Sequence, residues 1–206
     1  QLKQDAEVEV ELENGEKTIE QISIKNHKQG TFDWINSTKL VPEIINERVS
    51  EFKTKHHGKD VTKELRGELE EIFSVGLDTI SSEMISTLLA NIYCVYPGYI
   101  LINNNEKKEL LMFGKENLKR YFDPDVKPRY FLKKTRAKTS RQIWVEEFDG
   151  EIVNTNLRIR MLTNNGITAL LGKSQFNKSS VPSIKIQQDK VDKFIESCKD
   201  KVRTNY

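Results

Sequence analysis

Four polar residues near the start of the chain are of the types that can cut a phosphodiester bond. They are Asp5, Glu7, Ser23 and Lys25. Hydrolysis of a phosphodiester needs a hard cation held by oxygen atoms, an activated water molecule and a positive group near the developing charge. Carboxylates and a lysine supply these parts, provided that the fold brings them together.

The elements that must position these residues are two strands joined by a tight turn. Residues 6–12 alternate apolar and acidic side chains, which is the period of a half-buried strand, and residues 18–24 are rich in β-branched side chains. Between them, residues 13–15 read Glu-Asn-Gly and suit a three-residue hairpin loop. The register that this loop sets places Asp5 opposite Ser23, at the open end of the hairpin.

The same register sorts the side chains of the hairpin into two faces. It pairs Ala6 with Ile22 and Val10 with Thr18, whereas a two-residue turn would scramble the apolar pattern. We expect the even-numbered positions to form a core face, made of Ala6, Val8, Val10, Leu12, Ile22 and Ile24. The odd-numbered face then carries Asp5, Glu7, Glu9, Gln21, Ser23 and Lys25.

The stretch from Lys3 to Val10, the Asn-Gly turn and the run Ile22-Ser-Ile-Lys-Asn resemble the PD-(D/E)XK nuclease superfamily. The similarity is to its restriction-endonuclease branch in particular. In that family an Asp opens one strand, and the (D/E)XK tripeptide lies on the next strand with its middle residue buried. The resemblance implies that Asp5 binds metal, that Lys25 is catalytic and that Ile24 is buried.

The chain departs from this family pattern at two positions. Gln4 replaces the proline before Asp5, and Ser23 replaces the acidic residue of the tripeptide. Some restriction enzymes with an SXK tripeptide recover the carboxylate from a downstream helix. The candidates here are Glu7 on the hairpin, and Glu43 and Glu47, which are four residues apart on a helix expected after Pro42. If none of them reaches the metal, the protein only binds its partner.

Charge is unevenly distributed along the chain, although the net charge is only +2. Residues 5–20 hold seven acidic side chains, and residues 127–141 hold seven basic ones and no acidic one. Basic side chains neutralise phosphates, so the second segment is a candidate nucleic-acid contact, although a plain solvated loop would look the same. The candidate contacts are Lys127, Arg129, Lys133, Lys134, Arg136, Lys138 and Arg141, extended by Arg158 and Arg160 on a later strand.

The rest of the chain predicts an α/β (α+β) fold with a mixed central sheet and a helical insertion, and the resemblance implies that this sheet is of the restriction-endonuclease type. We expect one domain over residues 1–206, with the catalytic hairpin and a helix in 1–55, the insertion in 61–96, and mixed strands with a closing helix in 99–206. Apolar runs predict strands at residues 99–102, 110–113, 130–132, 142–148, 157–162, 167–171 and 183–186, with a hairpin turn at Asn164-Asn165-Gly166. His56 and His57 are expected to be a solvated pair on a loop.

Taken together, these features predict a Mg²⁺-dependent endodeoxyribonuclease that cuts double-stranded DNA, with a homodimer built on helices 61–95 as its expected assembly. Two isolated cysteines and the lack of a long apolar run favour a cytoplasmic protein of a bacterial or phage-infected cell, with no membrane partner. A strand so close to Gln1 leads us to expect a fragment that lacks N-terminal residues. The alternative is a catalytically inactive DNA-binding or phage-type interaction protein, and a viral structural protein is a third hypothesis.

Overall fold

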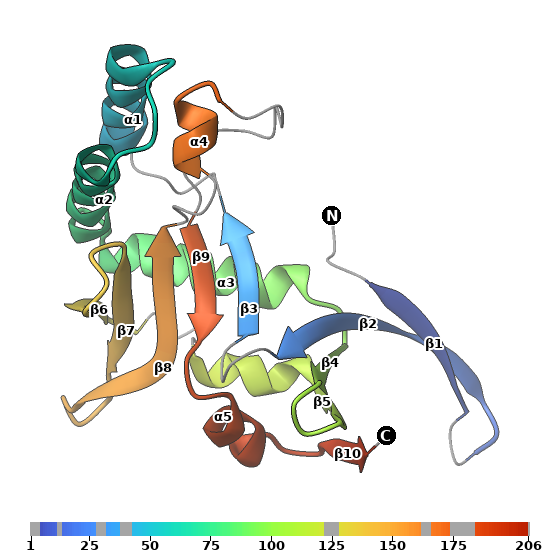
Figure 1. The fold of residues 1–206 in the computed structure, drawn as a ribbon. Coiled ribbons are helices and arrows are strands. Elements are labelled where there is room, and N and C mark those ends of the chain that lie inside the picture. The colour runs from blue at the N-terminus through green and yellow to red at the C-terminus, as the bar shows by residue number, and fades with distance from the viewer. Residues whose placement is uncertain are drawn as a thin grey trace. The chain divides into compact units, whose positions relative to one another are not determined.

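A computed structural model of the chain shows an α+β fold, as the sequence predicts (Figure 1). The structure describes residues 5–11, 14–27, 32–37, 43–121, 128–161, 166–173 and 184–205. The described strands form two five-stranded sheets, where the sequence analysis expects one central sheet. None of the described helices is by itself long and apolar enough to cross a membrane.

The chain divides into two compact units, each with one of the sheets. Unit 1 consists of Gln1–Asp33, Ser86–Pro128 and Gln188–Tyr206, and unit 2 of Trp34–Ile85 and Arg129–Gln187. The chain therefore passes between the units several times. The expectation of a single domain stays a prediction, because units linked in this way can fold together or separately.

The first sheet contains the predicted hairpin, and its strand order is β1-β2-β4-β5-β10. Its strands are β1 (Ala6–Glu11), β2 (Lys17–His27), β4 (Tyr99–Asn104), β5 (Glu109–Gly114) and β10 (Val202–Asn205). Ala6 lies opposite Ile22 and Val10 opposite Thr18, which confirms the predicted register. Strand β2 is parallel to β4, and the other neighbouring pairs are antiparallel.

The predicted core face of the hairpin is wrong beyond Ile22. Ser23 and Lys25 are 0% and 7% exposed, whereas Ile24 is 38% exposed and Val8 43%. The reason lies in β4, because Ser23 pairs with Ile100 and Lys25 with Ile102, and those two residues are fully buried. The odd-numbered side of β2 therefore faces the interior of unit 1.

The even-numbered side of the first sheet carries an apolar hollow instead of a closed core. Its volume is about 610 Å³, and Val8, Ile22, Tyr99, Met112 and Val202 are among the residues that line it. Val202 is 59% exposed. The apolar alternation of the hairpin therefore forms a partly exposed surface.

Unit 1 is completed by helical segments and an aromatic cluster. Most of α3 (Ser82–Val95), the 3₁₀ helix η1 (Lys115–Tyr121) and α5 (Val191–Ser197) belong to it, and all three were predicted as helical segments. The ring centroid of Phe194 lies 6.0 Å from that of Phe32 and 5.2 Å from that of Phe113. This cluster joins α5 to the first sheet.

The second sheet has the strand order β3-β9-β8-β7-β6. Its strands are β3 (Phe32–Ser37), β6 (Tyr130–Lys134), β7 (Ser140–Glu146), β8 (Ile152–Met161) and β9 (Ile184–Gln188). One side is a closed apolar core, with exposures of 1% or less at Ile143, Leu157, Ile159, Met161, Ile184 and Ile186. Buried and half-buried side chains alternate along β8, as they do along β4 of the first sheet.

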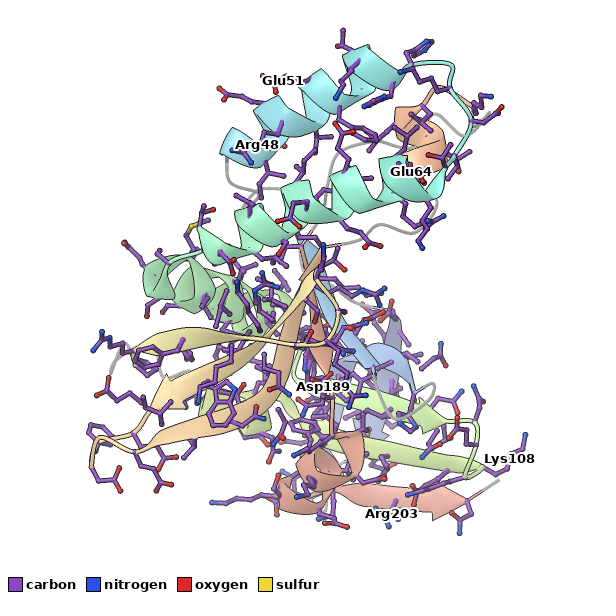
Figure 2. All side chains as sticks on the ribbon, turned by 60° about the vertical axis from the view of Figure 1, so that its left-hand side comes forward. Arg48, Glu51, Glu64, Lys108, Asp189 and Arg203 are labelled. Atoms are coloured by element: carbon purple, nitrogen blue, oxygen red, sulfur yellow. The ribbon has the colours of Figure 1, made fainter. Side chains whose placement is uncertain are left out.

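The helices of unit 2 are α1 (Glu43–His56), α2 (Lys63–Asp78) and the short α4 (Gly166–Leu170). Helix α2 begins after Thr62, whose hydroxyl accepts a hydrogen bond from the Leu65 amide, as an N-cap residue does. Arg48 and Glu51 are exposed on α1, and Glu64 is exposed on the first turn of α2 (Figure 2). The two helices were predicted from their apolar stripes.

Two local predictions are wrong, and one strand was not predicted. Residues 167–171 were expected to form a strand and belong mostly to α4, because a short apolar run does not distinguish a buried strand from a buried helix. His56 ends α1 with its Nε2 atom 3.0 Å from Glu68 and is only 5% exposed, so it is no solvated loop residue. Strand β3 was not foreseen. Asn164 and Asn165 of the expected turn lie outside the described residues.

Candidate active site

The carboxylate of Asp5 is held across the open end of the hairpin. The Ser23 hydroxyl donates to Asp5 Oδ2 over 3.0 Å, and the backbone amide of Ile24 donates to the same atom over 2.8 Å. The Asp5 amide in turn donates to the Ile22 carbonyl over 3.0 Å. Both side-chain hydrogen bonds end on Oδ2, so Oδ1 is the atom left for a cation.

Lys25 lies two residues further along β2 and therefore on the same side as Ser23. Its side chain is 7% exposed, and Nζ lies 4.9 Å from the centroid of the Tyr96 ring. A buried ammonium group is costly unless its surroundings stabilise the charge, and the face of an aromatic ring does so in part. The two residues on which the nuclease resemblance depends, Asp5 and Lys25, are thus on one side of β2.

Tyr96 connects the hairpin to a carboxylate that sequence reasoning missed. Its side chain is fully buried, and burial raises the pKa of its hydroxyl. The negative charges of Asp5 and Asp33 raise that pKa further, and such an effect requires that both carboxylates are near. Asp33 is half-buried on β3, and its neighbours in the sequence, Phe32 and Trp34, are buried. In the sequence, an acidic residue with an aromatic residue on each side was the feature that could have indicated a partly buried carboxylate here.

His27 continues the buried polar row of β2 beyond Lys25. It is 4% exposed, and neither ring nitrogen has a hydrogen-bond partner among the described residues. Buried polar groups without partners are rare and require an explanation. We define the buried polar row as Ser23, Lys25 and His27.

The residues present fit a magnesium ion, although only as a small site. Within the described ranges, no group of three or more His, Cys, Asp and Glu side chains could hold a metal. Mg²⁺ is usually bound through one or two carboxylates, with water and substrate phosphates completing its shell. Asp5 supplies one hard oxygen ligand, and Asp33, the other carboxylate that acts on Tyr96, is the candidate for a second.

The other predicted carboxylates are not placed with Asp5 by the structure. Glu7 is exposed on β1 and lies opposite Gln21. Glu47 is exposed on α1, which belongs to unit 2, and the side chain of Glu43 lies outside what the structure describes. Their roles in binding the metal therefore stay predictions.

The basic segment is not one solvated surface. Arg141 is 2% exposed, and its guanidinium group donates to Asp78 over 2.9 Å and to the carbonyl and hydroxyl oxygens of Ser74 over 3.0 Å. It also donates to the carbonyls of Lys138 and Ser140 over 2.8 Å. The prediction that Arg141 contacts phosphate is therefore wrong, because it ties β7 to α2 inside unit 2.

Two further lysines of the segment form ion pairs with α2. Lys134 lies 3.3 Å from Asp78, and Lys138 lies 3.2 Å from Glu71. Partial burial alone would raise the pKa of Asp78, but hydrogen bonds and charges from Arg141 and Lys134 outweigh it and lower that pKa. These cations stabilise the attachment of the β6–β7 hairpin to α2.

The remaining basic candidates lie elsewhere. Arg129 is paired with Glu146 at 3.6 Å, Arg136 is exposed, and Lys127 lies outside the described residues. Lys133, Arg158 and Arg160 are on the side of the second sheet opposite Arg141, as the strand alternation requires. Phosphate contact by these residues stays a prediction.

Comparison with known proteins identifies no relative of the chain. No protein-family model matches the chain, and no curated protein or solved structure matches it significantly.

Proposed function

We propose that the chain is a Mg²⁺-dependent endodeoxyribonuclease whose active site lies at the open end of the β1–β2 hairpin. The observation that carries the proposal is the Asp5 carboxylate, held by Ser23 and the Ile24 amide on the hairpin that buries Lys25. The positions of Asp5 and Lys25 are those of the metal-binding Asp and the catalytic Lys in PD-(D/E)XK nucleases, whereas Ile24, the middle residue of the tripeptide, is 38% exposed and not buried as the resemblance implies.

Each residue has a distinct role in the proposed reaction. Asp5 and Asp33 would hold the cation, and Ser23 positions Asp5 through its hydrogen bond. Bound Mg²⁺ polarises a phosphate oxygen and lowers the pKa of a water molecule. Lys25 orients the attacking water and stabilises the negative charge that develops in the transition state. Its burial strengthens that effect, since water screens the charge poorly there.

A second function is favoured by Ser23 itself. Its side chain is fully buried and donates to Asp5, so the first position of the tripeptide offers no carboxylate. A catalytically inactive DNA-binding or interaction protein would have the same hairpin. Such a protein would keep a salt-dependent affinity for DNA without needing metal.

The test is cleavage of mixed plasmid and phage DNA by the full chain, in Mg²⁺ and in EDTA. The wild type is compared with Asp5→Asn, Asp33→Asn and Lys25→Ala, and with Glu9→Gln as the matched control. Glu9 is an exposed carboxylate on β1, the strand that follows Asp5. Among the contacts described, it pairs only with Lys17, at 2.7 Å. Far-UV circular dichroism establishes that each variant is folded.

We expect metal-dependent fragments from the wild type and Glu9→Gln, and none from the three site variants. Cutting that survives Asp5→Asn would move the active site away from the hairpin. If the wild type cuts no DNA with Mg²⁺, the enzyme proposal is overturned. DNA affinity that persists in that case would support the binding protein.

A further inference from the structure

The second sheet has a cationic side that none of the preceding roles uses. Cross-strand pairing places Phe131 opposite Trp144 and Gln142 opposite both Lys133 and Arg158, so these residues share one side of the sheet. The Arg158 guanidinium also donates to Gln187 over 3.0 Å, which brings β9 into the same side. We define the cationic face as Phe131, Lys133, Trp144, Arg158, Arg160 and Lys185.

Within unit 2, this face is the less buried side of the sheet. The opposite side carries Ile143 and Ile159, both fully buried, and Arg141, which is bonded to α2. The residues of the cationic face are half-buried, except for Lys133, which is exposed. A ligand that approached this side would therefore meet charged and aromatic side chains first.

The charge on the cationic face favours a polyanion. Four of its six residues are cations, whereas the whole chain has a net charge of only +2. The one acidic residue on the same side of β6 and β7 is Glu146, and Arg129 pairs with it at 3.6 Å. Closely spaced phosphates would neutralise a surface of this kind.

The two aromatic residues of the face add a preference for unpaired bases. Lys133 Nζ lies 3.5 Å from the centroid of the Trp144 ring, and Arg129 Cζ lies 4.9 Å from that of Phe131. A cation–π contact at an accessible site is weaker than the stacking of a base on an aromatic ring. A base can therefore displace either cation, which then reaches the adjacent phosphate.

We propose that the cationic face binds a single-stranded nucleic acid, with bases stacked on Trp144 and Phe131 and phosphates bound by its four cations. A duplex fits this face poorly, because its bases are stacked on one another and present only their edges. The inference goes beyond the proposed cleavage, since it uses residues of unit 2 and requires no metal.

The experiment is a titration of the full chain with a 15-nucleotide oligothymidine in EDTA, followed by tryptophan fluorescence. The chain has two tryptophans, and only Trp144 is accessible, since Trp34 is 1% exposed. Stacking on Trp144 is expected to quench the emission in a saturable manner. Each phosphate contact with a single strand contributes about −0.7 to the slope of log K against log[salt]. Four contacts therefore predict a slope of about −3.

Variants test the geometry through the anisotropy of a labelled oligomer. Trp144→Leu is expected to weaken binding at least tenfold and Trp144→Phe much less, because Phe keeps a stacking surface. Arg160→Gln should reduce the salt slope by about 0.7. Lys138→Gln is the matched control, since Lys138 lies on the same hairpin but pairs with Glu71 on α2, and its affinity should be unchanged.

Absence of quenching and of binding would overturn the inference. So would a duplex of the same sequence that binds as tightly as the single strand, or a Trp144→Leu variant that is folded and retains full affinity. The result is distinguishable from that of the cleavage test, because binding is measured without metal.

Discussion

Two regions of the molecule bury a cation on a strand, and they differ in the groups that lie around it. Arg141 on β7 is 2% exposed and donates to a carboxylate, a hydroxyl and backbone carbonyls at 2.8–3.0 Å. Lys25 on β2 is 7% exposed beside the Tyr96 ring, in a row that also contains His27, whose ring nitrogens have no partner among the described residues.

On the proposed function, the difference separates a structural use of a buried charge from a functional one. A network in which every donor is satisfied rigidifies a fold, and Arg141 joins β7 to α2 in this way. His27, next to Lys25 in the buried polar row, has no described partner, and buried groups of this kind cost stability and are concentrated where a protein binds or reacts. Mutations in the two regions should therefore have opposite effects on stability and activity.

The largest effect on stability is expected from Arg141→Ala. Removing the guanidinium leaves the Ser74 hydroxyl and several buried carbonyls without a donor, so the free energy of unfolding should fall by about 3 kcal/mol. Urea unfolding measures it. Arg136→Ala is the control, because Arg136 is exposed on the same hairpin, and its effect should stay within about 0.5 kcal/mol. Equal losses in both variants would contradict the structural role of Arg141.

Lys25→Met should have the reverse profile. Met has a similar length and keeps the apolar contacts of the Lys25 stem, so the free energy of unfolding should fall by less than the ~3 kcal/mol expected for Arg141→Ala. Loss of a positive group next to the reacting phosphate should lower the rate of DNA cleavage about 100-fold or more. A variant that cuts DNA normally but unfolds easily would place Lys25 with Arg141 as a structural residue.

Sequence reasoning predicted the geometry of the hairpin better than its burial. The length of the turn fixes the register, so Asp5 could be placed at Ser23 from local information alone. The pairing of β2 with β4, more than 70 residues later in the chain, determines which side of β2 is buried. The alternation of residues 6–12 gives no information about that pairing.

Distant partners also explain the other errors at the candidate sites. Arg141 sits in a run of basic residues and looks solvated, and only Asp78, 63 positions earlier, reveals that it is buried. Asp33 was missed because the strand that carries it follows no clear period in the sequence. Most helices and strands were predicted correctly, since their apolar periods are local properties.

His27 and His56 allow the same comparison, between a buried group without a described partner and one with a partner, with smaller expected effects on stability. His27→Leu removes two buried nitrogens that have no described partner, so the free energy of unfolding should rise by about 1 kcal/mol. His56→Leu is the matched control in unit 2, because His56 is equally buried but bonded to Glu68 at 3.0 Å, and it should lose about 1 kcal/mol. Thermal unfolding of both variants checks the signs. A loss of stability in His27→Leu would mean that the row of β2 is structural.

The smallest expected effect is the pH dependence of the Arg141 cluster. The pKa of Asp78 is lowered in the folded chain, so its contribution to stability is present above the unfolded value of about 3.9 and is lost as the pH falls through the folded value. Asp78 is 44% exposed, and solvent screening keeps the contribution below about 1 kcal/mol. The difference in unfolding free energy between the wild type and Asp78→Asn should therefore shrink from pH 6 to pH 3.

Glu71→Gln, which removes an exposed ion pair, should show little difference at either pH. A constant difference for Asp78→Asn would mean that Arg141 is stabilised by its neutral partners alone.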